Sequence, residues 1–544
     1  MTENHLYFGD NLDVLRQYVG SESVDLVYLD PPFNSNRNYS VIFNRDGQAS
    51  EEDTAQIQAF EDTWHWTHVT DTQFSNFVAN APLEAADALS AFHTLLGEND
   101  AMAYLVNMAP RLLELHRVLK PTGSLYLHCD PTMSHYLKVL LDSIFGARNF
   151  VNEIVWQRAH TVKGNVGQGA KHFGRNTDSI LFYSRADNHT FNQAYGEYTD
   201  KYLERFRHVE PETGRRYRTV SMIGPGGAAK GNPQYEVMGV TRFWRYSKQK
   251  MQELIDSDMV VQSKPGAVPE RKLYLDEGKG SAIQSLWTDI VEINPMAAER
   301  LGYQTQKPVA LLERIIAAST NEGDVVLDPF CGCGTTVDAA QRLGRKWIGI
   351  DITYIAVDLI KARLQDTYGD SVIGPDDITG IPKDVAGARA LFAKSPFEFE
   401  RWAVSLVGAE PNQKQVADRG VDGRARFPVD GKGSVGKIVV SVKGGRTVGP
   451  SAVRDLRGAL DRESDAHMGV LITLSAATRG VRDEIDHGGT YKLPANSEIY
   501  PRLQHITVGE LLDGKRLDLP ATERPYIRAR KHSVKASTEA LFDV

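Results

Sequence analysis

The 544-residue sequence has little cysteine, no long apolar run and no secretory leader pattern. An odd set of three cysteines (Cys129, Cys331 and Cys333) argues against a disulfide framework, and no further cysteine pair or histidine cluster near them suggests a zinc site. No apolar segment approaches the ~20 residues that a membrane helix needs. The N-terminus, MTENHLYFGD, lacks a basic stretch followed by an apolar one. We therefore expect a soluble, cytoplasmic protein.

Neither sign of charge is in large excess, since 62 basic residues face 70 acidic ones and the net charge is −8. That balance argues against indiscriminate nucleic-acid binding. The distribution is uneven, however. Residues 41–100 hold eleven acidic side chains and one basic, whereas residues 201–275 hold fourteen basic and eight acidic. A DNA-binding face can therefore be hidden in the total.

The composition, 41% hydrophobic and 24% charged, is typical of a globular protein, and the length suggests about three or four domains. Short apolar runs alternate with helical patterns, which predicts an α/β fold. In the first half we expect a helix over 101–119, ended by Pro121-Thr122-Gly123, and strands over 24–29, 124–128, 151–156 and 179–183. We expect the acidic segment 41–100 to be rich in loops.

The βα rhythm returns with a helix over 309–320 and a strand over 325–328. A glycine-rich loop, a further helix and a strand over 347–350 follow. Residues 396–515 show another α/β pattern, with strands predicted over 437–442 and 469–474.

The glycine-rich loop, Asp328-Pro-Phe-Cys-Gly-Cys-Gly-Thr-Thr336, follows a strand and opens a helix. Gly332 and Gly334 permit a tight turn and a close approach of the backbone to a ligand. Asp351 ends the next strand 23 positions after Asp328, and an acid about 20 residues on binds ribose hydroxyls in doubly wound sheets. No lysine follows Gly334, so this is not a phosphate loop. These residues predict a site for a nucleoside-containing cofactor.

This loop resembles the S-adenosylmethionine-binding motif of amino-group DNA methyltransferases, and Asp30-Pro31-Pro32-Phe33 resembles their catalytic motif. The catalytic motif comes first and the cofactor motif follows more than 290 residues later. That order resembles the beta group of these enzymes, which includes type II and type III modification methylases. The resemblance covers about residues 1–365. It implies a circularly permuted Rossmann-like fold, S-adenosylmethionine as cofactor and double-stranded DNA as substrate.

The resemblance also assigns residues outside the loop. Gln306-Lys307-Pro308 is similar to a helix-entry motif that packs against the methionine part of the cofactor. Gly9-Asp10 is similar to the permuted N-terminal acid that touches the adenine, although Asp10 also fits a helix N-cap. The resulting cofactor set is Asp10, Lys307, Pro308, Asp328, Phe330, Gly332, Gly334, Thr335 and Asp351.

An exocyclic amine is a poor nucleophile because its lone pair is delocalised into the ring. The Asp30 carboxylate and the Pro31 carbonyl can accept hydrogen bonds from that amine and orient it. The prolines keep the turn rigid, and Phe33 can stack on an extruded base. No cysteine follows a proline, which argues against cytosine-C5 methylation. In the family an aspartate at the first motif position favours adenine, so cytosine-N4 remains the alternative.

Residues 160–290 occupy the place of the family's target-recognition region and interleave arginine with aromatic residues. Arginine can read guanine edges or hold phosphates, and for any one arginine a solvated surface role stays open. The aromatic side chains can stack on bases or fill gaps. The arginines proposed for DNA binding are Arg205, Arg207, Arg215, Arg242 and Arg245.

The C-terminal α/β segment resembles the Mrr-like branch of restriction-endonuclease folds through Asp422 and the run from Val439 to Gly445. In that family an acid, and an acid or glutamine two residues before a lysine, hold Mg²⁺. Asp422 and Lys443 match, and Glu398 or Glu400 offers another acid. Ser441 departs from the pattern because a hydroxyl lacks a carboxylate's charge. A metal nuclease, a DNA-binding degenerate nuclease and an unrelated fold all remain open.

The predicted organisation has six parts: 1–159 with an acidic insertion over 41–100, 160–290 for target recognition, 291–368 for the cofactor, a linker over 369–395, 396–515 as the restriction-endonuclease-like domain, and a tail over 516–544. The predicted function is adenine-N6 methylation of DNA in restriction-modification or phage defence. Its rivals are cytosine-N4 methylation, a single-chain restriction enzyme and a non-catalytic DNA-binding subunit. A homodimer and separate restriction or defence subunits are the partners considered, and the acidic insertion fits either shielding of the site or dimer contacts.

Overall fold

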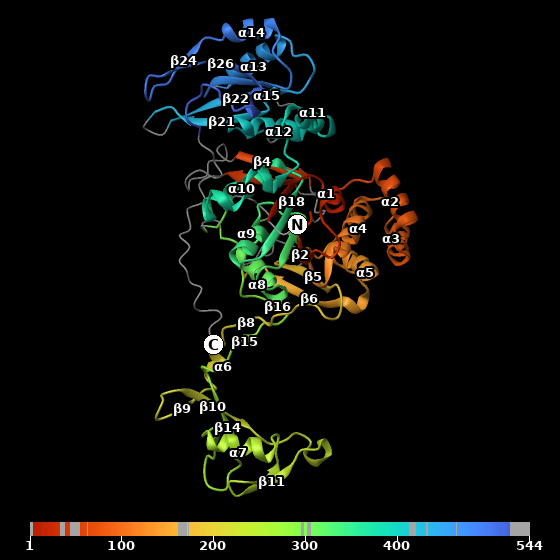
Figure 1. Cartoon of the computed structure of the whole chain (residues 1–544), viewed down its shortest axis with the longest axis vertical. Coiled ribbons are helices and arrows are strands. Elements are labelled where there is room, and N and C mark those ends of the chain that lie inside the picture. Colours follow the sequence, from red (N-terminus) through yellow and green to blue (C-terminus); the bar gives the residue numbers. More distant parts are fainter. Residues whose placement is uncertain are drawn as a thin grey trace. The chain divides into compact units, whose positions relative to one another are not determined.

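The computed structural model describes residues 4–32, 38–43, 55–61, 64–160, 171, 173–294, 297, 299–301, 306–412, 420–430, 434–463 and 465–522, with backbone only for 38–43 and 55–61. Phe33 lies outside the described residues. The chain divides into two compact units. Residues 193–284 form one, and residues 1–192 together with 285–544 form the other (Figure 1).

The larger unit contains a nine-stranded sheet that brings the two predicted motifs together. Its order is β16 (Leu286–Trp287), β6 (Phe150–Gln157), β7 (Thr177–Ser184), β5 (Leu119–Cys129), β2 (Val24–Leu29), β17 (Val325–Asp328), β18 (Lys346–Asp351), β1 (His5–Phe8), β19 (Ile378–Thr379). All pairings are parallel except those of β7. Leu26 and Val27 of β2 pair with Val326 and Leu327 of β17. Strands about 300 positions apart in sequence therefore end side by side.

Continuous burial explains why β2 is apolar at five of its six positions; the exception, Asp25, forms an ion pair with Lys120 at 2.7 Å. All six of its residues are buried, as expected for a central strand of a parallel sheet that is covered on both faces. Helix α4 (Asp100–Val118) confirms the predicted helix, and its buried face includes Leu105, Met108, Leu112 and Leu115. Helices α8 (Val309–Ser319), α9 (Thr335–Arg342) and α10 (Tyr354–Tyr368) follow in the second half.

The expectation of a loop-rich segment over 41–100 is wrong for residues 68–96, which form helices α2 (His68–Asn80) and α3 (Leu83–Leu96). Ala85, Leu89 and Phe92 are spaced on one helical face and enter the core. The acidic composition hid this periodicity, and the three acidic residues within these helices, Asp71, Glu84 and Asp87, are exposed. The predicted helix stop at 121–123 is instead part of β5, whose register shifts against β2 in this stretch.

Residues 369–395, which we interpreted as a linker, contain regular structure. Strand β19 extends the main sheet by pairing with β1, and α11 (Val385–Lys394) follows. The C-terminal sheet then has the order β20 (Glu410–Pro411), β21 (Gly423–Pro428), β22 (Val435–Lys443), β23 (Ala466–Thr473), β26 (Leu503–Thr507). Strands β22 and β23 confirm the two predicted strands. Helices α12 (Pro396–Leu406), α13 (Ser451–Arg462), α14 (Arg479–Asp486) and α15 (Val508–Leu512) complete this region.

The unit formed by residues 193–284 has its own small core. A four-stranded sheet has the order β13 (Val260–Val261), β14 (Glu270–Tyr274), β10 (Arg216–Ser221), β9 (His208–Val209), and β11 (Gln234–Val237) pairs with β12 (Val240–Phe243). Trp244, Met222 and residues of α7 (Lys248–Asp256) pack together. At the start and end of the unit, β8 (Tyr195–Gly196) pairs with β15 (Ser281–Ala282).

Within the described part of the chain, none of the helices combines the length and the apolar character that spanning a bilayer requires.

Candidate active site

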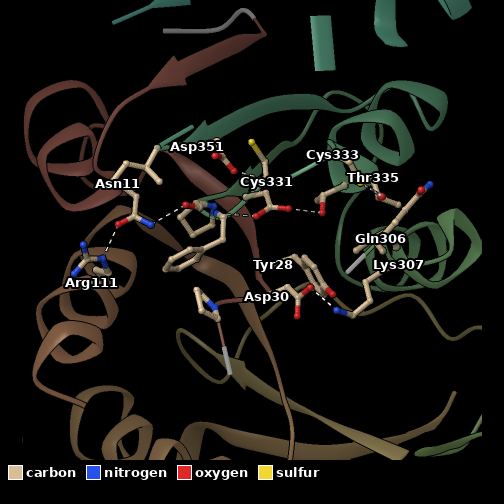
Figure 2. A pocket seen from close by; sticks show the side chains of 18 of the residues that line it. Asn11, Tyr28, Asp30, Arg111, Gln306, Lys307, Cys331, Cys333, Thr335 and Asp351 are labelled. Carbon is tan, nitrogen blue, oxygen red and sulfur yellow. Dashed lines mark hydrogen bonds and ion pairs between the residues drawn. The ribbon is translucent and has the colours of Figure 1, made fainter. Parts of the chain in front are cut away.

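A pocket lies where the central strands of the large sheet end (Figure 2). Of the residues predicted for the site, those that line it are Asp10, Asp30, Pro32, Lys307, Asp328, Phe330, Gly332, Thr335 and Asp351. Pro31, Pro308 and Gly334 are adjacent in sequence to lining residues but do not line the pocket themselves. The two halves of the chain thus contribute to one cavity.

Asp30 follows the last residue of β2 and has two differently placed carboxylate oxygens. Oδ2 forms an ion pair with the Lys307 ammonium group. Oδ1 is buried and has no hydrogen-bond partner among the residues that the structure describes. The ion pair fixes the carboxylate, so Oδ1 is an oriented acceptor without a donor. A buried acceptor of this kind is costly unless a ligand satisfies it.

The glycine-rich loop is held by the two acids that flank it in the sheet. Asp328 accepts hydrogen bonds from Thr336 Oγ1 (2.5 Å) and from the Phe330 amide (3.0 Å). Asp351 accepts one from the Gly332 amide at 2.9 Å. Burial raises the pKa of Asp328 to about 7 and that of Asp351 to about 6.

Both glycines adopt backbone conformations that disfavour other residues. Gly332 has φ +49° and Gly334 has φ +76°. Gly334 precedes α9, so the loop presents backbone amides and a helix N-terminus toward the pocket. This geometry fits the prediction of a ligand approached closely by the main chain.

Asp10 caps a helix and also lines the pocket, and its contact with the adenine of the cofactor stays a prediction. Its Oδ1 accepts from the Leu12 amide at 2.8 Å, which caps α1 (Asn11–Tyr18). Its Oδ2 pairs with Arg111 Nη2 at 2.8 Å. Arg111 Nε also donates to Asn11 Oδ1 at 2.6 Å, and Asn11 Nδ2 donates to the Pro329 carbonyl at 2.8 Å. This chain of contacts links the N-terminal segment to the glycine-rich loop.

Sequence reasoning missed Asn11, Tyr28, Trp64 and Arg111, all of which line the pocket. A usable signal existed for Arg111, because it interrupts the apolar face of α4 and is 8% exposed. A charged residue at such a position needs a buried partner.

The pocket carries an excess of negative charge. Its charged lining residues are four acids and two cations, namely Asp10, Asp30, Asp328, Asp351, Arg111 and Lys307. A cationic ligand is therefore favoured over an anionic one.

The arginines proposed for DNA binding differ in their surroundings within residues 193–284. Arg215 donates to Asp276 at 2.7 and 2.8 Å and to Glu277 at 2.8 Å, and it lies over the Tyr274 ring. These contacts indicate a structural role for it. The other four, Arg205, Arg207, Arg242 and Arg245, are exposed. Phe206 and Trp244 are buried, so they fill the core of this unit and do not face bases.

In the C-terminal region, Asp422, Ser441 and Lys443, which the resemblance assigned to one site, lie close together. Asp422 Oδ2 accepts from Ser441 Oγ at 3.2 Å and from the Val442 amide at 2.6 Å, and lies 3.5 Å from Lys443 Nζ. Glu398 is engaged elsewhere, by Arg401 and the Tyr354 amide. Among the described residues, no group of three or more His, Cys, Asp or Glu side chains is arranged to hold a metal ion.

Two family models match separate parts of the chain. The model of the DNA methylase family that covers N6 and N4 enzymes matches residues 24–362, and the chain belongs to this family. A second model, described as NACHT-associated inactive restriction endonuclease 1, matches residues 397–513. The C-terminal region is therefore restriction-endonuclease-like, and the match is to an inactive group.

Three curated relatives illustrate the similarity. The type II methyltransferase M.EcaI of Enterobacter cloacae is 31% identical over 264 residues, which are 48% of this chain and 57% of that protein. The Mod subunit of the type III restriction-modification enzyme StyLTI of Salmonella typhimurium is 25% identical, with 63% of this chain and 51% of that protein covered. The DNA adenine methyltransferase YhdJ of Escherichia coli is 26% identical, with 66% of this chain and 83% of that protein covered. The chain thus spans little more than half the length of two of these relatives.

Proposed function

We propose that the chain methylates DNA at adenine N6, with S-adenosylmethionine as the methyl donor and the target base flipped into the pocket. The observation that carries this proposal is the Asp30 carboxylate at the end of β2. One oxygen is held by Lys307, and the other is buried without a partner among the described residues. An amine that donates to Oδ1 satisfies it and is oriented by the same contact.

The chemistry follows from that contact. An exocyclic amine donates two hydrogens, and the Asp30 carboxylate with the adjacent Pro31 carbonyl offers two acceptors. Holding both N–H bonds turns the nitrogen lone pair out of conjugation and toward the methyl donor. A base inside a duplex is out of reach, so the target must leave the stack. Phe33 remains our prediction for a stacking residue.

The residues present fit the proposed cofactor. When bound, it supplies an electrophilic methyl group on a sulfonium. The cofactor also carries an amine, and the excess of acidic residues around the pocket complements these cationic groups. We assign Asp351 to a contact with the ribose and the Gly332 backbone to a close main-chain contact. Lys307 and Asp10 line the same pocket.

We expect cofactor affinity to weaken as pH falls below about 7. Burial raises the pKa of Asp328 to about 7 and that of Asp351 to about 6 in the ligand-free protein. A bound cation favours the ionised carboxylates, so protons compete with it at low pH. Calorimetry at pH 8 and pH 6 should give a dissociation constant roughly tenfold higher at pH 6. S-adenosylhomocysteine, which lacks the sulfonium charge, should show a smaller change, and equal pH dependence for both would contradict the assignment.

Replacing Asp351 with alanine is expected to weaken cofactor binding by roughly 10–100-fold, which corresponds to losing a charge-assisted hydrogen bond. The change also removes the hydrogen bond that the Gly332 amide donates to Asp351 at 2.9 Å. Asp366→Ala, at an exposed position on α10, is the matched control. If calorimetry gives the same dissociation constant for Asp351→Ala as for the unaltered protein, Asp351 is not part of the site.

Two observations favour adenine over cytosine as the target base. Aspartate at the first position of the catalytic motif favours adenine, and one relative is named as a DNA adenine methyltransferase. Incubation with tritiated-methyl cofactor and mixed genomic DNA, followed by nucleoside mass spectrometry, tests the proposal. We expect N6-methyladenine. Detection of N4-methylcytosine would support the same mechanism with cytosine as the target base. Absence of a methylated product on any DNA would overturn the proposal.

The proposal extends to the whole chain. The catalytic motif precedes the cofactor motif although their strands are neighbours, which supports a circularly permuted order. We propose that the exposed arginines of residues 193–284 contact DNA, that the chain acts in restriction-modification or phage defence, and that separate restriction subunits are its partners. The type III relative is named as a Mod subunit, which supports the last point.

For residues 396–515 we propose DNA binding without cleavage. Support comes from Ser441 in place of an acid and from the similarity to an inactive group. Mg²⁺-dependent cleavage of unmethylated DNA that is lost in Asp422→Ala would instead favour a single-chain restriction enzyme.

A further inference from the structure

Three buried polar side chains form a hydrogen-bonded chain that starts at the pocket. Tyr28 Oη lies 2.9 Å from His128 Nδ1, and His128 Nε2 lies 3.1 Å from Asp178 Oδ2. Their exposures are 2%, 0% and 3%. They come from β2, β5 and β7, which are neighbours in the sheet. The methyl transfer as proposed above does not use them.

The donor and acceptor of the Tyr28–His128 and His128–Asp178 hydrogen bonds can be assigned. Burial would raise the pKa of Asp178, but the hydrogen bond from His128 and the charge of Arg158, 3.1 Å away, hold it below its usual value. Ionised Asp178 only accepts, so His128 Nε2 carries a hydrogen. In the neutral ring Nδ1 is then the acceptor, and the Tyr28 hydroxyl donates to it.

The Tyr28 end of these hydrogen bonds lies beside the Asp30 carboxylate, although Tyr28 and Asp30 are not hydrogen-bonded to each other in the ligand-free protein. Tyr28 and Asp30 are two positions apart, so their side chains leave the strand end on the same side. Both line the pocket, and Figure 2 shows the Tyr28 ring beside Asp30 and Lys307. Because the Tyr28 hydroxyl donates to His128, its oxygen lone pairs remain as acceptors. The charged groups that act on these hydrogen-bonded side chains are Arg158 and Lys307 at Asp178, and Asp30 and Asp328 at Tyr28.

We propose that Tyr28, His128 and Asp178 form a relay that removes the proton released by the target amine. The inference rests on methyl transfer at Asp30. The N–C bond forms as the S–C bond of the donor breaks, and the methylated nitrogen then gives one proton to the Asp30 carboxylate. Asp30 passes it to the Tyr28 oxygen as Tyr28 gives its own proton to His128 Nδ1. The resulting imidazolium is stabilised by ionised Asp178. After product release the proton returns through Tyr28 to Asp30 and leaves to solvent from the vacated pocket, which restores the ionised carboxylate.

The test is Tyr28→Phe, which removes the hydroxyl and retains the ring. Single-turnover methyl transfer should slow at least tenfold at pH 7, while calorimetry gives cofactor affinity within twofold of the unaltered protein. With saturating cofactor, the pH profile of the single-turnover rate should differ between Tyr28→Phe and the unaltered protein, because the variant has lost a path for the proton. His128→Gln should change the profile in the same way.

The matched control is Tyr126→Phe. Tyr126 pairs in register with Tyr28, is equally buried, and its hydroxyl lies 2.7 Å from Ser319 Oγ, but it does not line the pocket. We expect its rate and pH profile to match the unaltered protein. If Tyr28→Phe slows methyl transfer but leaves the pH profile unchanged, Tyr28 acts only through packing and the relay is overturned.

A second readout does not depend on activity. Histidine ¹⁵N resonances of the full chain should show His128 as the Nε2–H tautomer, and Tyr28→Phe should shift its Nδ1 signal while Tyr126→Phe leaves it in place. A different tautomer overturns the relay whether or not the protein methylates DNA. If the resonances agree but the unaltered protein transfers no methyl group, the proposed function fails and the relay's task fails with it.

Discussion

Alanine in place of Asp30 is expected to lower the rate of methyl transfer by about a thousandfold and to leave cofactor affinity within a few fold. The expected loss is that of a preorganised group aimed at the reacting atom. Removing the carboxylate leaves the target amine with one acceptor, the Pro31 carbonyl. Cofactor affinity is retained because the glycine-rich loop is tied by Asp328 and Asp351, which the substitution does not touch.

Single-turnover rates and calorimetry on the same preparation measure the two effects. Removing Asp30 also leaves the Lys307 ammonium without its ion-pair partner at Asp30, so the melting temperature should be recorded alongside. Asp30→Asn preserves the shape and should lose transfer comparably.

Asp130→Asn is the matched control for the Asp30 variants. Asp130 also precedes a proline, follows the neighbouring strand β5, and bonds locally to Thr132 at 2.9 and 3.0 Å. It does not line the pocket, so its rate should stay within about threefold of normal. Near-normal transfer by Asp30→Ala would remove Asp30 from the reaction.

The second large effect is expected for Gly334→Ala. An added Cβ would lie 2.6 Å from Ile360 Cγ1 on α10, and the backbone there has φ +76°. Left-handed strain and the clash together should cost about 2–4 kcal/mol of folding free energy. To relieve the clash the loop must move away from α10, so cofactor binding should be lost at concentrations that saturate the unaltered protein.

Gly323→Ala separates these two contributions. Gly323 also has positive φ, +84°, but an added Cβ would meet no atom within 4 Å. Denaturant unfolding should show a loss of about 1 kcal/mol for this variant, with normal cofactor binding. Equal destabilisation of the two variants would mean that contact with Ile360 does not constrain the loop.

The cofactor loop and the catalytic turn were predictable because each is local. A strand, a turn and a helix entry lie within about twenty residues around Gly332, and Asp30-Pro31-Pro32 directly follows a short, mostly apolar strand. The core strands and α4 were predictable for the same reason, since their periodicity is contained in one segment. Helices α2 and α3 were missed because acidic residues on their outer faces obscured the apolar spacing of residues such as Leu89.

The contacts that complete the site join distant segments and leave no local pattern. Lys307 was assigned to the cofactor from its motif, and its pairing with Asp30, 277 positions away, had no local signal. Tyr28 and His128 are 100 positions apart, and each looks like an ordinary strand residue in isolation. Arg215 was placed with the DNA contacts because its acidic partners, Asp276 and Glu277, lie about sixty residues further on.

The pairing of β8 with β15 has a consequence for how these proteins can change. Ala282 faces Tyr195, and the Ile283 amide donates to the Ala194 carbonyl at 3.0 Å, so the unit enters and leaves through one narrow two-stranded stem. A single tight turn could close that stem if the residues between were removed. The pocket residues all lie before this stem or after it. The 193–284 unit therefore has the connections of an exchangeable cassette, and if it contacts DNA as proposed, swapping it is expected to redirect one chemistry to new DNA sequences.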